Sequence, residues 1–523
     1  DVRVIHIATP GLQGPPGEVS RRDIAQISRA PMVARVLDKF LAGQAGVSGL
    51  AVGRSGTTYN LYCAIAPSLF SRYDLVADSA EPGGYTLRQL QGLAVVAPML
   101  STAYNDAAVT PSGTWTPGTN PGAYNGAYAY SIAAGASLTY TTPATTAVGL
   151  RGPVATNGGK YARVSIDGST TAADLLPTAQ DEVTAGRLDP TALVANGGTL
   201  DPADRILNAY VNSTSLTDYD RRVALATGLS SATHTVRVEN TGYALVVVDP
   251  AGQRFYVSAF AYGDSTLIPG AAGTALFSVA SLSGVVSAWE YAARVLPDGG
   301  TTATFIGNVH GYEVEDSFTV VADDSTLSLS DGQIVTATRD VVVTRVSHLL
   351  HPDTGTTTIA DCQIVYTLGR YGLTTDCSIT WRTHATVSAL YSMLPLNGTL
   401  LSSVPQAVQF NRAGLLEFPG TLTFTGSNGD AYYGQSKSAA MWMWGGKYGV
   451  FFHLPAVEDF TDDWANSVFY SRVEDRNGTM TKGYVGRTWG NAETVTPGQA
   501  LAWRAVYTAG YFGGGAETAL SAL

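Results

Sequence analysis

The sequence predicts a mainly β fold, built as serial β-sandwich or jelly-roll domains after a short N-terminal collagen-like and helical segment. Charged residues make up only 14% of the 523 residues, whereas a typical soluble domain carries about 25%. Glycine accounts for 57 residues, well above the usual share of about 7%. The third observation is a period of two: Ala162, Val164 and Ile166 alternate with polar or larger residues, as in strands with one buried face.

The same composition excludes several classes of protein. A net charge of −11 without a Lys/Arg cluster argues against a nucleic-acid partner, which needs a basic face. No run of 18 apolar residues is present, so we expect no membrane insertion. The three cysteines, Cys63, Cys362 and Cys377, show no zinc-binding spacing, and we expect no metal and no cofactor. Cys362 and Cys377 are expected to be buried thiols, and a bridge across a hairpin is the alternative.

Residues 1–43 are predicted to be an attachment and trimerisation segment. After a short strand over residues 1–9, the run GLQGPPG places Gly11, Gly14 and Gly17 at period three around two prolines. This is the collagen pattern, since only glycine fits at the axis of three wound chains; a polyproline linker is the alternative. Two short helices over 20–43 then carry an apolar stripe, formed by Ile24, Ile27, Val33, Val36, Leu37 and Phe40. The stripe suits a trimer interface, or packing against the following domain.

The rest of the chain divides into three parts that differ in composition and in strand pattern. Residues 44–105 predict a small mixed domain of unknown role. From about residue 106, short β-rich runs bounded by glycine, asparagine and aspartate predict a jelly-roll domain over 106–250. Residues 251–523 continue the all-β texture without the same motifs and predict a C-terminal β-sandwich.

Four stretches between 112 and 243 occur in an order that resembles a known carbohydrate-binding fold. They are a GTW-type first strand, TTPATTAVGLRGP, NGGKYARVSIDG, and YDRRVALATGLSSATHTVRVENTG. This order resembles the galactose-binding-type jelly roll, which occurs as a carbohydrate-binding module and in front of some esterases. The resemblance implies saccharide binding, although many such domains only pack against their neighbours.

Aromatic residues are the candidates for sugar contact, because the C–H face of a pyranose stacks on an aromatic ring. A turn-rich stretch holds Trp115, Tyr124, Tyr128 and Tyr130, and a second aromatic run places Trp442 and Trp444 two residues apart, on one face of a strand. Packing of these rings in the core is the alternative, most of all for Trp442 and Trp444.

Evidence for catalysis is weaker. The run Gly263-Asp264-Ser265 resembles the GDS block of SGNH esterases, but no Asp-x-x-His follows to supply a base. If the chain is an enzyme, His310 and Glu313 are the candidate acid–base pair, because they are close in sequence and flanked by glycines. A structural histidine is the alternative, and we expect a binding protein rather than an enzyme.

The whole layout resembles a bacteriophage tail fibre or receptor-binding protein: GLQGPPG, then a short apolar helical segment, then Gly/Thr-rich β-domains. The resemblance implies a homotrimer on the virion tail, attached to baseplate or tail proteins through residues 1–43. The distal domain, 251–523, would be receptor-binding and would act outside the host cell on a surface polysaccharide. The alternatives are a virion-associated or secreted polysaccharide-degrading lyase or esterase, and a structural head fibre.

Overall fold

The computed structural model of the 523-residue chain describes most of the sequence beyond residue 48. The described residues are 49–66, 68–78, 87–193, 200–210, 218–264, 275–278, 287–369, 372–398, 412–415, 418–423, 431–436, 439–445, 448–454, 469–476 and 480–511. The predicted collagen-like run and all six residues of the predicted apolar stripe lie outside them.

The described residues confirm a mainly β protein made of antiparallel sheets, with one short α-helix, α2 (Ala179–Thr184). Thr178 caps this helix, because its hydroxyl accepts from the Asp181 amide while the Asp181 carboxylate accepts from the Thr178 amide. No helix within the described ranges is long and apolar enough to cross a membrane. Cys63, Cys362 and Cys377 are free and buried, which confirms the expected thiols.

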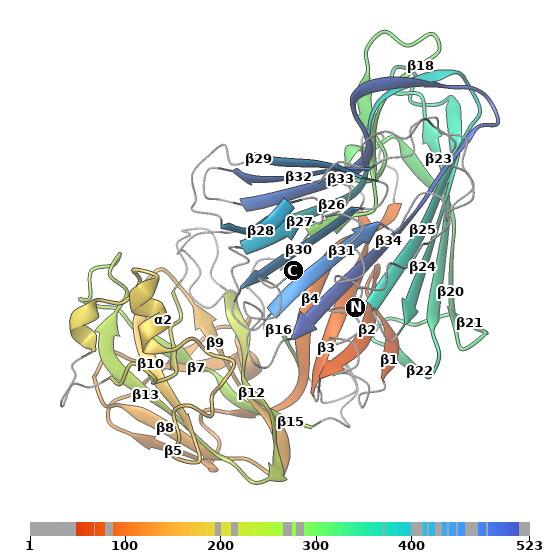
Figure 1. The fold of residues 1–523 in the computed structure, drawn as a ribbon. Coiled ribbons are helices and arrows are strands. Elements are labelled where there is room, and N and C mark those ends of the chain that lie inside the picture. Colours follow the sequence, from red (N-terminus) through yellow and green to blue (C-terminus); the bar gives the residue numbers. More distant parts are fainter. Residues whose placement is uncertain are drawn as a thin grey trace, which may run out of the picture.

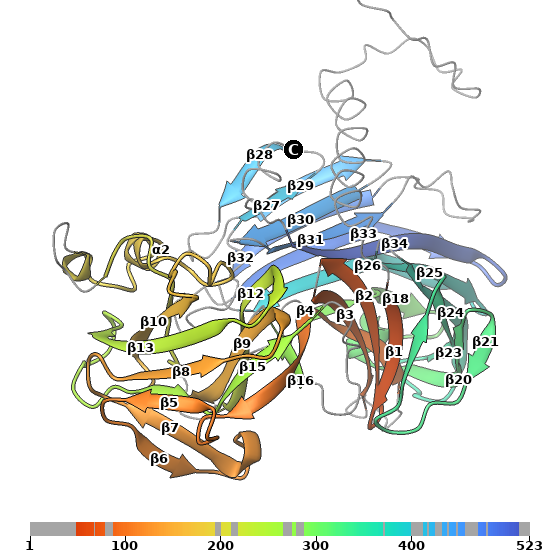
Figure 2. The ribbon, with the colours of Figure 1, turned by 90° about the horizontal axis from the view of Figure 1, so that it is seen from below.

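The strands form two lobes, seen side by side in Figure 2. The smaller lobe contains β5 (Val109–Ser112), β6 (Thr116–Thr119), β7 (Ala127–Ser131), β8 (Ser137–Thr141), β9 (Thr145–Val154), β10 (Lys160–Ile166), β11 (Ile206–Leu207), β12 (Asp218–Ala232), β13 (Thr235–Ala244), β14 (Phe255–Val257) and β15 (Ala259–Gly263).

The larger lobe begins with β1 (Leu50–Ser55), β2 (Thr58–Ala66), β3 (Leu69–Asp78) and β4 (Leu87–Ala103). It continues with β16 (Ala275–Ser278), β17 (Ser287–Trp289), β18 (Ala292–Pro297), β19 (Thr304–Ile306), β20 (Glu313–Ala322), β21 (Ser325–Leu327), β22 (Ile334–Ala337), β23 (Val341–Leu350), β24 (Thr358–Gly369), β25 (Gly372–Trp381) and β26 (Ala385–Gly398). It ends with β27 (Arg412–Leu415), β28 (Phe418–Thr423), β29 (Ala431–Ser436), β30 (Ala439–Gly445), β31 (Tyr448–Leu454), β32 (Phe469–Arg476), β33 (Met480–Val495) and β34 (Ala500–Tyr511).

The smaller lobe is a two-layer sandwich. A five-stranded sheet in the order β11-β10-β13-β8-β5 faces the strands β12-β9-β15, and apolar side chains from both layers fill the space between. The alternation predicted for β10 is present, because Ala162, Val164 and Ile166 are at most 1% exposed. A three-stranded sheet, β14-β7-β6, closes the side of this lobe.

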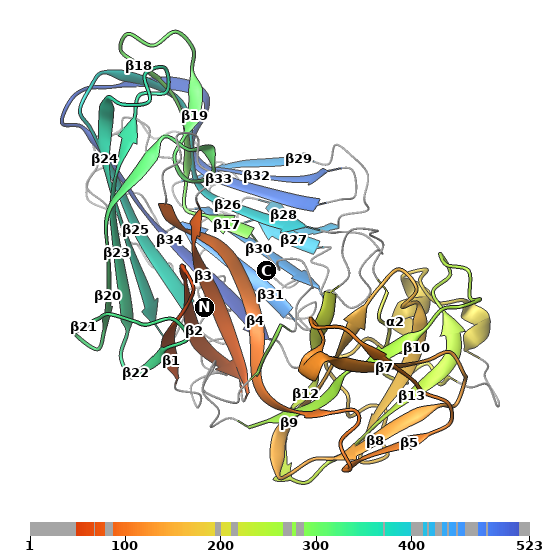
Figure 3. The same ribbon diagram turned by 180° about the vertical axis from the view of Figure 1, so that it is seen from behind.

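The larger lobe packs two large sheets face to face. One carries β4-β3-β2-β1-β22, and the other is ten-stranded, β21-β20-β23-β24-β25-β34-β31-β30-β27-β28. Figures 1 and 3 show β1 to β4 lying over β24, β25 and β34, and one continuous apolar core fills this interface. A seven-stranded sheet, β19-β18-β26-β33-β32-β29 with β17 beside β26, completes the lobe.

The two lobes share a sheet. Strand β4 pairs with β3 through residues 87–96 and with β15 through residues 100–103, so one nine-stranded sheet runs from the larger lobe into the smaller one. The sheet contains strands from both sides of residues 105–106 and from both sides of residues 250–251, where the sequence predicts domain boundaries. That these boundaries separate independently folding domains stays a prediction. The described part of segment 44–105 consists of β1 to β4.

Candidate functional site

The three-stranded sheet of the smaller lobe carries tyrosines on its outer face. Because side chains alternate along a strand, β7 turns Ala129 into the core and Tyr128 and Tyr130 outward, where both are half-buried. On β14, Phe255 and Val257 enter the sandwich core, and Tyr256 lies directly opposite Tyr130 in the register. The outer face of the sheet is therefore aromatic.

These rings touch one another. The centroid of Tyr256 lies 5.7 Å from that of Tyr130 and 5.8 Å from that of Tyr128, and Tyr219, at the start of β12, lies 6.2 Å from Tyr128. Such spacings are typical of favourable aromatic pairs. Gly118 on β6 stands opposite Tyr128 in the register, and a Cβ atom there would come within 3.0 Å of the Tyr128 ring. Glycine at this position makes room for the ring.

Two arginines extend the aromatic face. The guanidinium carbon of Arg254 lies 4.2 Å from the centroid of Tyr130, and that of Arg151 lies 4.2 Å from the centroid of Tyr124. Arg151 also donates to both oxygens of Asp220, at 2.8 and 2.5 Å, and the Tyr124 hydroxyl donates to the Ser101 carbonyl at 3.0 Å. We call this set the tyrosine–arginine surface; it comprises the half-buried residues Tyr124, Tyr128, Tyr130, Tyr219 and Arg254, together with Tyr256 and Arg151, which are only 6% and 7% exposed.

The surface presents neutral hydroxyls beside a permanent positive charge. Burial raises the pKa of Tyr256 above its usual 10, so its hydroxyl stays protonated at neutral pH and donates to Oδ1 of Asn157 at 2.7 Å. Burial acts to lower the pKa of Arg254, but the nearby hydroxyls of Tyr256 and Tyr130 outweigh it and raise that pKa. Aromatic faces, hydroxyl and amide groups and a cation thus meet in one place.

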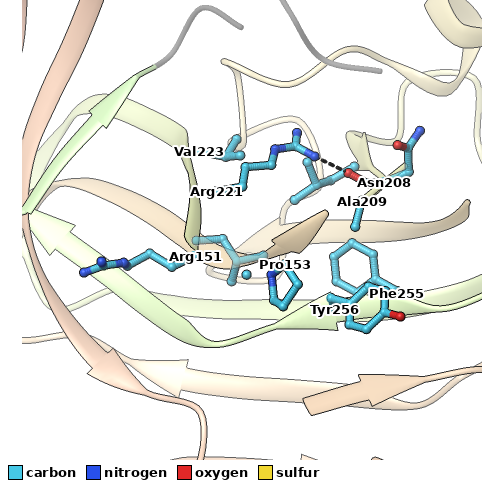
Figure 4. A pocket seen from close by; sticks show the side chains of 11 residues that line it. Arg151, Pro153, Asn208, Ala209, Arg221, Val223, Phe255 and Tyr256 are labelled. Carbon is cyan, nitrogen blue, oxygen red and sulfur yellow. Dashed lines mark hydrogen bonds between the residues drawn. The ribbon is translucent and has the colours of Figure 1, made fainter. Parts of the chain in front are cut away.

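A small cavity lies beside this surface (Figure 4). It has a volume of about 20 Å³ and is lined by Pro153, Arg221 and Tyr256, among others. Arg221 donates to the Asn208 carbonyl at 2.6 Å, and Arg151 points away from it. The volume suits about one water molecule, so the cavity is too small to hold a sugar ring, and a saccharide would contact the outer surface instead.

The sequence-predicted aromatic residues fall into three places. Tyr124 and Tyr128 belong to the tyrosine–arginine surface. Trp115 is half-buried, packs against the core of the sandwich and donates from its indole nitrogen to the Ser137 carbonyl at 3.2 Å. Trp442 and Trp444 are each 1% exposed on β30 in the larger lobe, where Phe451 stacks on Trp442 at 5.9 Å. Neither of these two buried rings offers a face to a sugar.

His310 and Glu313 occupy different environments. His310 is exposed in a short 3-10 turn, η3 (Asn308–His310), and stacks on Phe305 with centroids 5.1 Å apart. The Glu313 carboxylate is fully buried and accepts from four donors, namely the Tyr291 hydroxyl, the Asn308 amide, the Arg345 guanidinium and the Ser347 hydroxyl. A carboxylate whose acceptor positions are so occupied serves the structure and has no acceptor position left for a substrate. Ser265, of the GDS run, lies outside the described residues.

Sequence inspection missed Tyr219, Tyr256, Arg151 and Arg254. The run Arg254-Phe-Tyr-Val contains a usable signal, because strand alternation places Arg254 and Tyr256 on the face opposite Phe255 and Val257. Nothing in the sequence indicated that this face meets Tyr128 and Tyr130. Within the described residues, no group of three or more histidine, cysteine, aspartate or glutamate side chains could hold a metal ion.

No protein-family model and no curated protein matches the sequence. Among solved structures, a GH36 α-galactosidase from Geobacillus stearothermophilus aligns with 43% of this chain at 10% identity and a TM-score of 0.27. An α-galactosidase from Lactobacillus brevis aligns with 45% of it at 10% identity and a TM-score of 0.28. The aligned part spans only 30% and 31% of those two proteins. TM-scores this low establish neither a shared fold nor a shared activity.

Proposed function

We propose that this chain is a glycan-binding protein and that the tyrosine–arginine surface of the smaller lobe is its binding site. The observation that carries the proposal is the cluster of Tyr128, Tyr130, Tyr219, Tyr256 and Arg254, which come from separate segments and contact one another in the smaller lobe. Half-buried tyrosines supply flat apolar faces for a pyranose and hydroxyls for its polar groups. The resemblance of residues 112–243 to a galactose-binding-type jelly roll favours the same function.

The biological setting we propose is a bacteriophage tail fibre that adheres to host-surface polysaccharide. The collagen-like run and apolar stripe in residues 1–43 support a homotrimer, with the two lobes following the attachment segment. Three chains would raise a weak affinity per site through effective concentration. Adhesion without turnover fits the larger lobe as well, since the Glu313 carboxylate is enclosed by structural donors.

The first prediction is that Tyr128→Ala weakens glycan binding. Loss of one stacking ring should lower the affinity about 2- to 12-fold, since an aromatic contact contributes roughly 0.5–1.5 kcal/mol beyond its buried area. The measurement is titration of the full chain with polysaccharides from candidate host surfaces, after light scattering has shown the number of chains per particle. Three chains are expected; a monomer at micromolar concentration would contradict only the fibre setting.

The matched control is Tyr59→Ala. Tyr59 also lies near arginines, 5.9 Å from the guanidinium carbons of Arg54 and Arg88, but it belongs to the larger lobe and packs on Phe318. Its loss should leave glycan binding unchanged. Equal losses in the two variants, or binding that persists fully in Tyr128→Ala, would place the binding site elsewhere.

A further inference from the structure

We infer that the glycan bound by this protein is acidic and that Arg254 is the residue that recognises its anionic group. The inference rests on the proposed function and specifies the ligand class. The group is a carboxylate of a uronic acid or a sulfate ester on a sugar, because both carry the planar or tripodal oxygen array that a guanidinium binds.

The first observation is the pairing of charges in the smaller lobe. Most of its arginines face a carboxylate: Arg151 and Arg222 contact Asp220, Arg163 and Arg237 contact Glu239, and Arg187 contacts Glu182. Arg254 is different: among the described residues no carboxylate pairs with it, and its guanidinium contacts the Tyr256 hydroxyl at 3.5 Å and the Tyr130 ring. Because this side chain is only half-buried, its positive charge stays available to an anionic group of a ligand.

The second observation is that Arg254 is held in place. Its amide donates to the Asn157 carbonyl at 2.7 Å, and its carbonyl accepts from the Lys160 amide at 3.2 Å. The guanidinium lies over the Tyr130 ring, and such stacking restricts the side chain while leaving N–H groups at its edge for an anion. A pre-organised cation loses less entropy on binding than a mobile one.

The third observation is that neutral polar groups lie beside Arg254. Asn157 is half-buried, and its side-chain oxygen already accepts from the Tyr256 hydroxyl, which fixes the amide beside Arg254. The amide nitrogen can donate to a sugar hydroxyl. A carboxylate on Arg254, a hydroxyl on Asn157 and a pyranose face on the tyrosines describe a single acidic sugar unit.

The test compares acidic polymers with matched neutral ones on the full chain. Polygalacturonate is paired with its carboxyl-reduced form, and dextran sulfate with dextran. We expect the wild type to bind at least one acidic member about 10-fold or more tightly than its neutral partner, as a charge-assisted hydrogen bond contributes. Preference in the first pair identifies a carboxylate, and preference in the second a sulfate ester.

Arg254→Gln should bring the affinity for the acidic member down to that for its neutral partner and so abolish the preference, whereas Arg254→Lys keeps part of it. The control is Arg382→Gln, which removes the same charge from the larger lobe, where Arg382 pairs with Asp361. Melting curves confirm that each variant is folded. Equal binding of both members of each pair by the wild type overturns the acidic inference but leaves glycan binding intact; binding of neither member of either pair overturns both proposals.

Discussion

Gly118 and Gly414 each leave space for an aromatic ring, and the two rings differ in how deeply they are buried. A Cβ atom at Gly118 would come within 3.0 Å of the outer end of the half-buried Tyr128 ring, and one at Gly414 would come as close to the indole of Trp442. Tyr128 is half-buried, so we expect its ring to have room to move toward solvent, whereas Trp442 is 1% exposed and is enclosed on β30. The same added methyl group should therefore act on binding at one position and on stability at the other.

We accordingly predict that Gly118→Ala weakens glycan binding with little change in melting temperature. Gly414→Ala should instead destabilise the fold by about 1–3 kcal/mol, as overpacking of a core does, and leave the glycan affinity of the folded fraction unchanged. Thermal melts and glycan titrations of both variants provide the measurements. A loss of stability in Gly118→Ala equal to that in Gly414→Ala would show that Tyr128 is as immobile as Trp442.

At the scale of elements, the β12–β13 hairpin shows why the run GLSSATHTVRVENTG has its pattern. Gly228 adopts a positive φ of 71°, Val236 and Val238 enter the core, and His234 is 5% exposed where the two strands meet. Nδ1 of His234 lies 2.7 Å from the Asp167 carboxylate and Nε2 lies 2.9 Å from the Ser230 carbonyl. This histidine joins the hairpin to the turn after β10.

The hairpin should make stability depend on pH through His234. Burial acts to lower the His234 pKa, but the hydrogen bonds to Asp167 and to the Ser230 carbonyl raise it above 6.5. The folded state therefore holds this proton more tightly, so the contribution is complete below pH 6.5 and is lost as pH rises through the folded pKa. The bond to His234 lowers the pKa of Asp167, so at the acid end the contribution is lost as pH falls below about 3.8.

Melting temperatures of wild type and His234→Gln at pH 5.5 and pH 8.5 test this. The wild type should exceed the variant by more at the lower pH, because the charged pair is present only there. His348→Gln is the control, since His348 contacts Asp316 on an exposed part of the larger lobe and exposed pairs contribute little. A difference that is the same at both pH values would mean that His234 acts through packing alone.

At the scale of the whole molecule, a buried charged cluster joins the facing sheets of the larger lobe. Arg345, Glu290 and Glu313 are each 0% exposed, and Arg345 lies 3.1 Å from Glu313 and 3.6 Å from Glu290. Arg345 also donates to the Arg88 carbonyl on β4, and Glu290 accepts from the Leu90 amide on the same strand. The cluster therefore fixes β4 against β20 and β23.

Replacing Arg345 by methionine should destabilise the protein by about 3–5 kcal/mol, because it leaves two buried carboxylates without their cation. Arg382→Met is the matched control; its partner Asp361 is exposed, and a change of roughly 0–1 kcal/mol is expected. Denaturant unfolding of both variants measures the difference. If Arg345→Met unfolds at the wild-type midpoint, the cluster does not hold the sheets together.

The sequence was sufficient for the β class, because strand periodicity and turn residues are local signals. It also singled out Tyr124 and Tyr128 as candidates, and their role in sugar binding stays a prediction. It was insufficient for Tyr219 and Tyr256, whose contact with Tyr128 depends on pairing between distant strands. Trp442 and Trp444 show a different limit. Alternation correctly places them on one face, but only tertiary structure reveals that this face is covered as well. The sequence also did not predict that β4 continues from one lobe into the other. The length of a strand does not indicate which strands will pair with each of its halves.

The continuity of β4 has a mechanical consequence. A load applied to the smaller lobe, as by a ligand bound there under the proposed function, enters the larger lobe along a strand that is hydrogen-bonded to β15 at one end and to β3 at the other. Tension along a strand strains these transverse bonds in shear, so they resist together rather than opening one by one. We therefore expect the two lobes to resist a pulling force together. Two domains joined by a flexible linker would instead separate first, as the linker extends.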